Sequence, residues 1–313
     1  MNREGPGKIG YLDATWNPVV GCTHGCKWCW ARRQAKRQRK NCQKCYDFTP
    51  HLHAERLDEP LRKREPSVIG VCFMGDLFDP ALPVEDTVEV LNVMCAWRWP
   101  NAAARREGDE SALEDPGHTF VVLTKRPERL LECFLWADQH WPGDAPLSVA
   151  REGGDGRLPP HIVLGVSVED QASADRRIPE LLECSAAKRI VSIEPMRGPV
   201  KLRPRGWLDG RDDLGGCTVC AMPNRCRCTP QFPSLDGVIL GGQTGPDAVP
   251  MDPDWVRRVR DDCAAAGVPF YFKSWGKHVP RWAITRDPFG RNDRRMLDGR
   301  THDEVAWTKG GKA

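Results

Sequence analysis

The sequence lacks a long hydrophobic run: none of its 313 residues lies in a segment approaching the eighteen or so consecutive apolar residues of a membrane-spanning helix. The first ten residues, MNREGPGKIG, also lack the apolar core of a secretory signal. We therefore expect a cytoplasmic protein without a membrane partner. Charge of one sign is not in excess either, because the net charge is only +3, so the overall charge calls for no polyanionic partner.

Cysteine, by contrast, is abundant, with fourteen residues. A reducing cytosol disfavours a disulfide framework, which leaves metal ligands, a catalytic thiol or small buried side chains. Five cysteines are scattered through apolar or helix-like segments, and we interpret them as core residues. They are Cys72, Cys95, Cys133, Cys184 and Cys263. The other nine are clustered, and clustering is typical of ligands.

Apolar runs and amphipathic segments alternate along the chain. The runs are rich in Val, Ile and Phe, as in strands covered on both faces, and cover 67–74, 118–124, 161–168, 188–194, 236–242 and 268–275. The segments of helical length cover 83–99, 126–141, 170–184 and 252–267. With a further strand near residues 11–21, this alternation predicts a parallel sheet in an α/β fold, as a partial or complete (β/α) barrel. An open doubly wound sheet is the alternative.

The domain organisation follows from the same alternation. The barrel is predicted over residues 1–276, interrupted at about 203–235 by an insertion rich in Cys, Gly, Pro and Arg. Residues 277–313 have weak periodicity and are predicted to form an irregular tail packed on or near the barrel.

Three cysteines in eight residues, Cys22, Cys26 and Cys29, follow the predicted first strand with C-x3-C-x2-C spacing. A structural zinc site requires four ligands, and His24 lies inside a spacer too short to complete a tetrahedron. A 4Fe–4S cluster suits the loop better, because each cysteine binds a different iron and the fourth iron stays open. An open metal position is typical of a catalytic site.

This motif, with the aromatic Trp28 directly before the third cysteine, resembles the radical SAM superfamily. The resemblance implies an enzyme whose open iron chelates S-adenosylmethionine and whose cluster cleaves it to a 5′-deoxyadenosyl radical. It also implies an electron donor such as a flavodoxin or ferredoxin. The chain further resembles, over nearly its whole length, a phage and bacterial family of unknown function assigned to the same group. Motifs that carry this second resemblance include DATWNPVVGC, GDLFD, LTKRPERL, IEPMRGPV and GGQTGP, where Gln243 replaces an expected Glu.

Polar residues follow several predicted strands, where functional groups of such folds gather. By the resemblance, Gly75 and Asp76 hold the methionine ammonium, and Ser167 and Glu169 hold the ribose hydroxyls. Lys125, with its neighbour Arg126, suits the cofactor carboxylate or a substrate phosphate. The structural alternatives are that Asp76 caps the next turn and that Lys125 is a solvated charge.

Glu194 ends a predicted strand, and an acid buried there without a partner is costly, so we expect it to contact cofactor or substrate. Glu194 and Lys125 are the predicted catalytic residues. Gly241 and Gly242 are predicted to leave room for adenine or substrate, and Trp28 to lie against the cofactor.

The segment after Cys29 is basic and contains no acid up to Lys44, including Arg33, Lys36, Arg37 and Lys40. On a helix these side chains would cover most of the circumference, which predicts contact with the phosphates of DNA, RNA or a nucleotide. His51 and His53 belong to the same predicted footprint. A solvated basic helix is the alternative.

A second cluster has C-x2-C-x5-C-x-C spacing and predicts a zinc (Zn2+) knuckle or an auxiliary iron–sulfur cluster. Its members are Cys217, Cys220, Cys226 and Cys228. Cys42 and Cys45 can supply further ligands. A zinc nucleobase deaminase, suggested by His53-Ala54-Glu55, is rejected because no P-C-x-x-C half follows. The alternative to an enzyme is a zinc-stapled nucleic-acid-binding protein.

Overall fold

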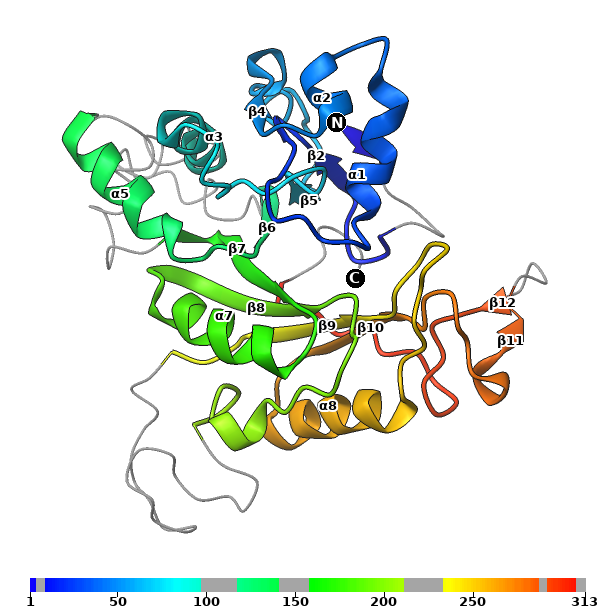
Figure 1. Cartoon of the computed structure of the whole chain (residues 1–313). Coiled ribbons are helices and arrows are strands. Elements are labelled where there is room, and N and C mark those ends of the chain that lie inside the picture. The colour runs from blue at the N-terminus through cyan, green and yellow to red at the C-terminus, as the bar shows by residue number, and fades with distance from the viewer. Residues whose placement is uncertain (4–8, 97–116, 141–157, 211–232, 287–291, 308–313) are drawn as a thin grey trace. The chain divides into compact units, whose positions relative to one another are not determined.

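The computed structural model describes residues 1–3, 9–96, 117–140, 158–210, 233–286 and 292–307 (Figure 1). The chain divides into two compact units. The first unit comprises Met1–Leu164, Cys184–Ala187 and Trp307–Ala313, and the second comprises Gly165–Glu183 and Lys188–Ala306. None of the described helices has the length and hydropathy needed to cross a membrane.

The first unit is built on a sheet with the strand order β1-β2-β5-β6. These strands are β1 (Asn2–Arg3), β2 (Ala14–Trp16), β5 (Val68–Val71) and β6 (Thr119–Thr124). The last three are parallel, whereas β1 pairs antiparallel with β2. The register aligns Trp16 with Val71 and Val71 with Val122, so the carboxyl ends of the three parallel strands lie next to one another. The residues that follow these strands can therefore meet.

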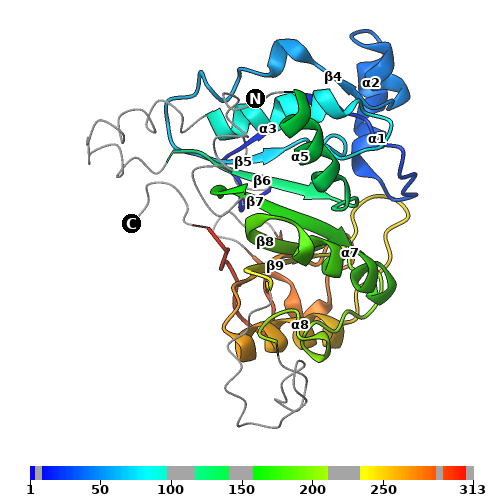
Figure 2. The same ribbon diagram turned by 90° about the vertical axis from the view of Figure 1, so that its left-hand side faces the viewer.

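Two helices pack against each other beside these strands, α3 (Val84–Ala96) and α5 (Arg129–His140) (Figure 2). A separate two-stranded ladder joins β3 (Val19–Val20) to β4 (His51–Leu52), antiparallel. Between these two strands the chain forms only short helices: α1 (Trp30–Ala35), η1 (Lys36–Gln38) and α2 (Gln43–Asp47). The 3-10 turn η2 (Ala54–Arg56) follows β4.

The second unit contains the parallel strands β8 (Ala186–Ile193), β9 (Gly237–Gly241) and β10 (Phe270–Ser274), in that order. The first two residues of β8 fall in the first unit, and the unit boundary also lies within β7 (Leu158–Val168). The helices are α7 (Gln171–Glu183) and α8 (Pro253–Ala266). The rest is short: η4 (Arg203–Arg205), η5 (Arg281–Ala283) and the antiparallel pair β11 (Thr285–Arg286) and β12 (Asn292–Asp293).

Local sequence explains the ends of α8. The Asp252 side chain accepts a hydrogen bond from the N–H of Asp254, Pro253 occupies the first helical turn, and Gly267 closes the helix with φ +69°. These residue types are the preferred ones at those positions. Helix α8 therefore agrees with the predicted range 252–267.

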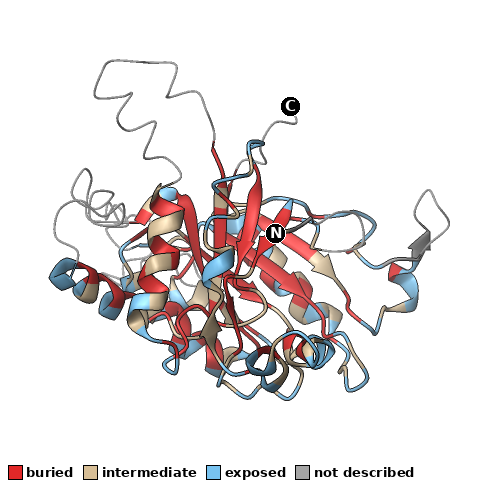
Figure 3. Ribbon diagram, turned by 90° about the horizontal axis from the view of Figure 1, so that it is seen from above, coloured by how far each residue is buried: buried red, intermediate tan, exposed pale blue. Residues whose placement is uncertain are grey.

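Strands β2 and β5 to β10 contribute much of the core, and most of their residues are buried (Figure 3). Cys72, Cys95, Cys133 and Cys263 are buried as predicted, while Cys184 is only half-buried. Strand β5 is shorter than its apolar run because Cys72 has a left-handed φ of 56° and turns the chain out of the sheet. The α/β class with parallel strands is confirmed.

The described part of the predicted tail makes contacts with β10. The indole N–H of Trp275 donates to the carbonyl oxygen of Met296 at 2.8 Å, and Tyr271 forms a bridge with Asp303. Residues 292–306, which belong to the second unit, therefore contact β10 within that unit. Most of the predicted insertion, residues 211–232, lies outside the described residues.

Candidate metal centres and the residues around them

The three-cysteine loop follows β3, and its cysteines are all half-buried. The Sγ of Cys22 accepts a hydrogen bond from the backbone N–H of His24 at 3.4 Å. The Sγ of Cys29, the N-cap residue of α1, accepts one from the N–H of Arg32 at 3.3 Å. Hydrogen bonds donated to sulfur favour the thiolate, which is the form that binds metal.

Two of these cysteines pack on one small apolar cluster formed by Ala31, Ala35 and Phe48. Cys22 and Cys29 both contact it. Burial raises the pKa of Cys22 to about 12, and the nearby Asp76 and Asp79 add to that increase. A bound cation would reverse this preference for the neutral thiol, because a coordinating thiol is deprotonated.

Asp79 anchors the three-cysteine loop. Its carboxylate accepts hydrogen bonds from the backbone N–H and the hydroxyl of Thr23, at 2.7 and 3.0 Å, and from the N–H of Ala81 at 3.0 Å. The side chain is fully buried. Thr23 lies directly after Cys22, so Asp79 fixes the backbone beside the first cysteine of the loop. Asp79 was not among the predicted site residues, although it is the second acid of GDLFD.

The buried Asp76 follows β5 and joins two strand ends. It accepts hydrogen bonds from the hydroxyl of Thr124 at 2.7 Å and from the N–H of Lys125 at 3.0 Å. It also accepts the N–H of Phe78 at 3.1 Å, as expected for a residue that caps the next turn. Burial raises its pKa. The carboxylate thus ties the end of β5 to the end of β6, where Lys125 is half-buried.

The glycine before Asp76 has a packing role. A Cβ on Gly75 would lie 2.5 Å from the carbonyl oxygen of Gly21, and the two glycines form a parallel bridge. This close approach brings the end of β5 against the start of the three-cysteine loop. The predicted contact of Gly75 with a cofactor stays a prediction, as does that of Trp28, whose carbonyl accepts from Arg33 at 3.1 Å.

In the second unit, Glu169 forms a buried ion pair with Arg177 of α7. Nη1 of Arg177 lies 2.9 Å from Oε2 of Glu169, and the two side chains are 3% and 8% exposed. The same Nη1 donates to the carbonyl oxygen of Ser167 at 2.6 Å. Arg177 thus orders both residues predicted to contact ribose. It was missed because these contacts span ten and eight positions in the sequence.

Glu194 is not the unpaired acid that the sequence suggested. Its carboxylate forms an ion pair with Lys273 of β10, and both side chains are half-buried. Gly241 lies beside this pair: a Cβ there would be 3.4 Å from Lys273 and 3.5 Å from Glu194. The prediction of an unpartnered charge is therefore wrong, because Lys273 of β10, the second strand along from β8 in the sheet, supplies the cation.

Gly242 and Gln243 hold the backbone that follows β9. A Cβ on Gly242 would lie 2.3 Å from the carbonyl oxygen of Trp275, so only glycine allows this contact. The side-chain carbonyl of Gln243 accepts from Arg197, and its amide donates to the carbonyl oxygen of Asp247 at 3.0 Å. The neutral side chain of Gln243 therefore has two hydrogen-bond partners, Arg197 and Asp247.

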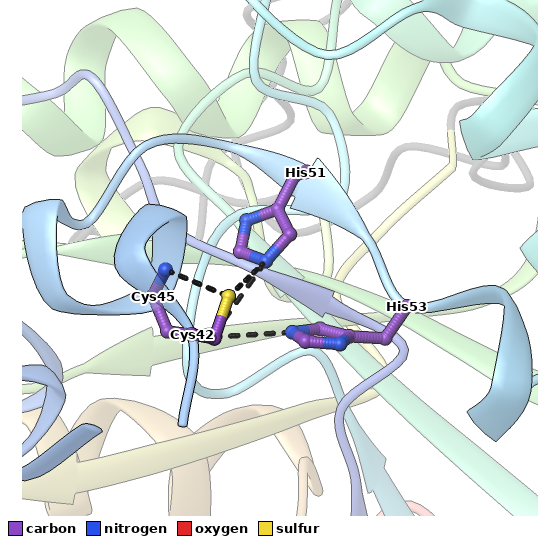
Figure 4. Close-up of side chains that lie close together, drawn as sticks. All are labelled: Cys42, Cys45, His51 and His53. Carbon is purple, nitrogen blue, oxygen red and sulfur yellow. Dashed lines mark hydrogen bonds between the residues drawn. The ribbon is translucent and has the colours of Figure 1, made fainter. Parts of the chain in front are cut away.

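A second group of ligand types converges in the first unit. One sulfur or ring nitrogen from each of Cys42, Cys45, His51 and His53 lies within 4.8 Å of all the others (Figure 4). Nε2 of His51 is 3.5 Å from the sulfur of Cys42 and 3.6 Å from that of Cys45. Nε2 of His53 is 3.1 Å from the sulfur of Cys45. This group can bind a metal such as zinc.

The two histidines correct the predicted phosphate footprint, because they face thiols rather than solvent phosphate. Burial lowers the pKa of His53, with Arg56 as the next cause, and a neutral ring can ligate a metal. The spacing C-x2-C-x5-H-x-H of residues 42–53 carried this information, but the histidines were assigned to the basic segment. The sequence-predicted knuckle at Cys217, Cys220, Cys226 and Cys228 lies outside the described residues.

The basic segment is not one helix. It comprises α1, η1 and the turn before Cys42, whose Sγ accepts the N–H of Cys45 at 3.3 Å and caps α2. Its basic residues are nevertheless exposed, including Arg33, Lys36, Arg37 and Lys40. Within the described residues, no ion pair joins any of these four to a carboxylate.

Comparison with known proteins identifies one family model that matches the chain. No curated protein and no solved structure matches the chain. A family model described as "Protein of unknown function (DUF5131)" matches residues 6–101 and 109–306, which include the three-cysteine loop and the Cys/His group. This match covers most of the sequence and agrees with the predicted resemblance to a family of unknown function. The chain therefore belongs to the DUF5131 family.

Proposed function

We propose that this protein is an iron–sulfur enzyme of the radical SAM type, in which Cys22, Cys26 and Cys29 hold a 4Fe–4S cluster. One observation carries the proposal. The three thiols lie on a single loop directly after β3, two of them with backbone N–H donors to sulfur, and buried Asp79 fixes the loop through Thr23. Positioned thiolates of this kind suit a cluster, and three of them leave one iron open.

A cluster held there would supply one electron to cleave S-adenosylmethionine into methionine and a 5′-deoxyadenosyl radical, after an electron donor such as a flavodoxin or ferredoxin has reduced it. The chain's own residues have distinct roles. The cysteines hold the metal, and the apolar cluster of Ala31, Ala35 and Phe48 covers two of their sulfurs. Asp76 fixes the strand ends beside the loop, and we assign the methionine ammonium to its carboxylate.

The cofactor contacts of the second unit rest on the resemblance. Ser167 and Gly241 lie at the carboxyl ends of β7 and β9, and Glu169, Glu194 and Gly242 directly follow β7, β8 and β9. Lys273 neutralises Glu194, and Arg177 neutralises Glu169. Because both acids are paired, we assign them to neutral hydroxyl groups of a ligand rather than to an ammonium. A partly or fully closed (β/α) barrel is part of the same proposal.

The decisive test is reductive cleavage of S-adenosylmethionine. After anaerobic reconstitution with iron and sulfide, the protein is expected to be brown and, with dithionite, to release 5′-deoxyadenosine and methionine without added substrate. Each of Cys22→Ala, Cys26→Ala and Cys29→Ala should abolish the colour and the release. Chromatography of the products and iron analysis measure both.

The matched control is Cys95→Ala, because Cys95 is buried in α3, outside the loop. It should retain cluster and cleavage. A reduced wild-type protein that binds iron but never releases 5′-deoxyadenosine would favour the zinc-stapled nucleic-acid-binding protein, for which the Cys/His group is the supporting observation.

For the substrate we propose a nucleic acid or nucleotide. The exposed basic residues begin at Arg33, in the helix that Cys29 caps, and Trp30 in the same helix is 47% exposed. Cations next to an exposed aromatic ring suit phosphates and an unstacked base. Such contacts position the substrate without reading its sequence.

Charge reversal tests this proposal. The triple variant Arg37→Glu, Arg39→Glu, Lys40→Glu is expected to weaken binding of a labelled DNA single strand. The negative slope of log K against log salt should decrease in magnitude by about 2–3, because each lost phosphate contact removes roughly 0.7–0.9. Fluorescence anisotropy across a salt series measures both values. Cleavage of S-adenosylmethionine without substrate should stay unchanged.

The control carries the same change of charge on exposed residues of the second unit: Arg176→Glu, Lys201→Glu, Arg281→Glu. Equal losses in the two variants would reduce the effect to net charge. An unchanged affinity in the first variant would leave a small-molecule or peptide substrate.

A further inference from the structure

The Cys/His group has the geometry of a single tetrahedral ion. With Zn–S near 2.3 Å and Zn–N near 2.0–2.1 Å, the sulfur–nitrogen edge of a tetrahedron is about 3.6 Å. The two separations from Nε2 of His51, 3.5 and 3.6 Å, match that edge, and the 3.1 Å from His53 to Cys45 is somewhat shorter. In a two-iron cluster with Cys2His2 ligands, sulfur and nitrogen bind different irons and lie farther apart. Convergence on one point therefore favours one ion.

We propose that Cys42, Cys45, His51 and His53 hold one structural Zn2+, and that this ion fixes the base on which the three-cysteine loop rests. Binding replaces the protons of the two thiols, which leave to solvent, and the two histidines bind as neutral rings. Four protein ligands fill the tetrahedron, so the ion has no open position for a water or substrate. This excludes the deaminase chemistry that His53 and Glu55 suggested.

Both histidines are oriented by a partner on the ring nitrogen that faces away from the group. Nδ1 of His51 lies 2.8 Å from the carbonyl oxygen of Thr49, and Nδ1 of His53 lies 2.9 Å from a carboxylate oxygen of Glu55. A proton on each Nδ1 leaves the lone pair of Nε2 directed at the sulfurs. Such partners are typical of metal-binding histidines.

The group is built by a tight chain reversal. Cys42 caps α2, and Phe48 ends that helix with a left-handed φ of 60°, which is uncommon for a residue other than glycine. The reversal brings His51 back over the two thiols. An ion bound by residues on both sides of the turn would hold this conformation in place.

The same turn supports the three-cysteine loop. The N–H of Cys22 donates to the carbonyl oxygen of Phe48 at 3.3 Å, and a Cβ on Gly21 would lie only 2.4 Å from the backbone of Thr49. Val20 pairs with His51 in the β3–β4 ladder. The chain that leads into Cys22 therefore rests on Phe48 and Thr49, which lead into His51.

Metal analysis of the full-length protein tests the ion. Glu55→Ala, at an exposed side chain, should fold normally and lower zinc affinity about 10–100-fold, as loss of a histidine's partner does. Cys45→Ser should lower the bound zinc by one equivalent relative to wild type, whatever the undescribed cysteines hold. Cobalt added in place of zinc should give the visible spectrum of a tetrahedral thiolate–imidazole site, and Cys45→Ser should lose it. Unchanged zinc content in Cys45→Ser would overturn the proposal.

A further measurement tests the coupling between the two metal centres, which rests on the proposed function. The Cys22→Ala, Cys26→Ala, Cys29→Ala variant should keep its zinc, whereas Glu55→Ala with its zinc removed by a chelator should take up less iron than wild type during reconstitution. Equal iron uptake would refute the coupling. Zinc bound as expected by a protein that never cleaves S-adenosylmethionine would refute only the proposed function.

If Cys45→Ser does not fold, the variant Cys22→Ala, Cys26→Ala, Cys29→Ala still decides the matter, because it retains the Cys/His group. A chelator should release one zinc equivalent from the triple cysteine variant and increase the rate of tryptic cleavage at the exposed Arg37, Arg39 and Lys40. Cleavage at an unchanged rate after zinc release would contradict a structural role.

Discussion

Replacing Arg177 with Met is expected to lower the free energy of unfolding by about 3–5 kcal/mol, because it leaves the charge of Glu169 buried without its counter-ion. The two side chains are almost completely buried, and Nη1 of Arg177 also donates to the carbonyl oxygen of Ser167. Urea unfolding followed by circular dichroism measures the change. The variant should also leave Ser167 and Glu169, the two residues assigned to ribose contacts, without the partner that fixes their positions.

The control is Arg176→Met, one position earlier on α7 and exposed, which should change the free energy of unfolding by less than about 0.5 kcal/mol. The double variant Glu169→Leu, Arg177→Met removes both charges and should recover most of the loss. A loss under about 1 kcal/mol in Arg177→Met would mean that the pair is not buried in solution.

Replacing Asp79 with Ala is expected to lower the iron affinity of the three-cysteine loop by about 10–100-fold, the range found when a group that orients metal ligands is removed. Asp79 holds Thr23 through two donors, and Thr23 adjoins Cys22. Stability should fall as well, by about 1–3 kcal/mol, because buried N–H groups lose their acceptor. Iron titration under anaerobic conditions measures the affinity.

Two further variants separate these effects. Thr23→Val keeps the backbone N–H donor to Asp79 and removes only the hydroxyl, so its iron affinity should lie between those of wild type and Asp79→Ala. The zinc of the Cys/His group should stay bound in both, since its four ligands do not contact Asp79. Wild-type iron affinity in Asp79→Ala would show that the loop holds its own conformation.

Local patterns explain why the elements were predictable. The alternation of apolar runs with amphipathic segments gave β5, β6, β7, β8, β9 and β10 and the helices α3, α5, α7 and α8 to within a few residues. Caps such as Asp252 and Gly267 act on their own neighbours, so their effect is readable from the sequence. Where a distant contact set the backbone, prediction failed. Cys72 turns out of β5 while its N–H donates to the carbonyl oxygen of Trp16 at 2.8 Å.

The site residues show the same division. The three-cysteine loop was visible because its cysteines lie within eight residues. Glu194 was taken as an unpartnered acid, since nothing near it in the sequence reveals Lys273, 79 positions later. Asp79 was overlooked for the same reason, because its partner Thr23 lies 56 positions earlier.

The sequence by itself determined the α/β class, the order of strands and helices, and the presence of cysteine clusters of ligand spacing, because periodicity, caps and spacing act over a few residues. Only the tertiary structure decided which side chains meet. Chelation and burial of charge depend on convergence in space, and that convergence is set by chain reversals and sheet register. The left-handed Phe48 brings His51 and His53 to Cys42 and Cys45, and the packing of α7 brings Arg177 to Glu169.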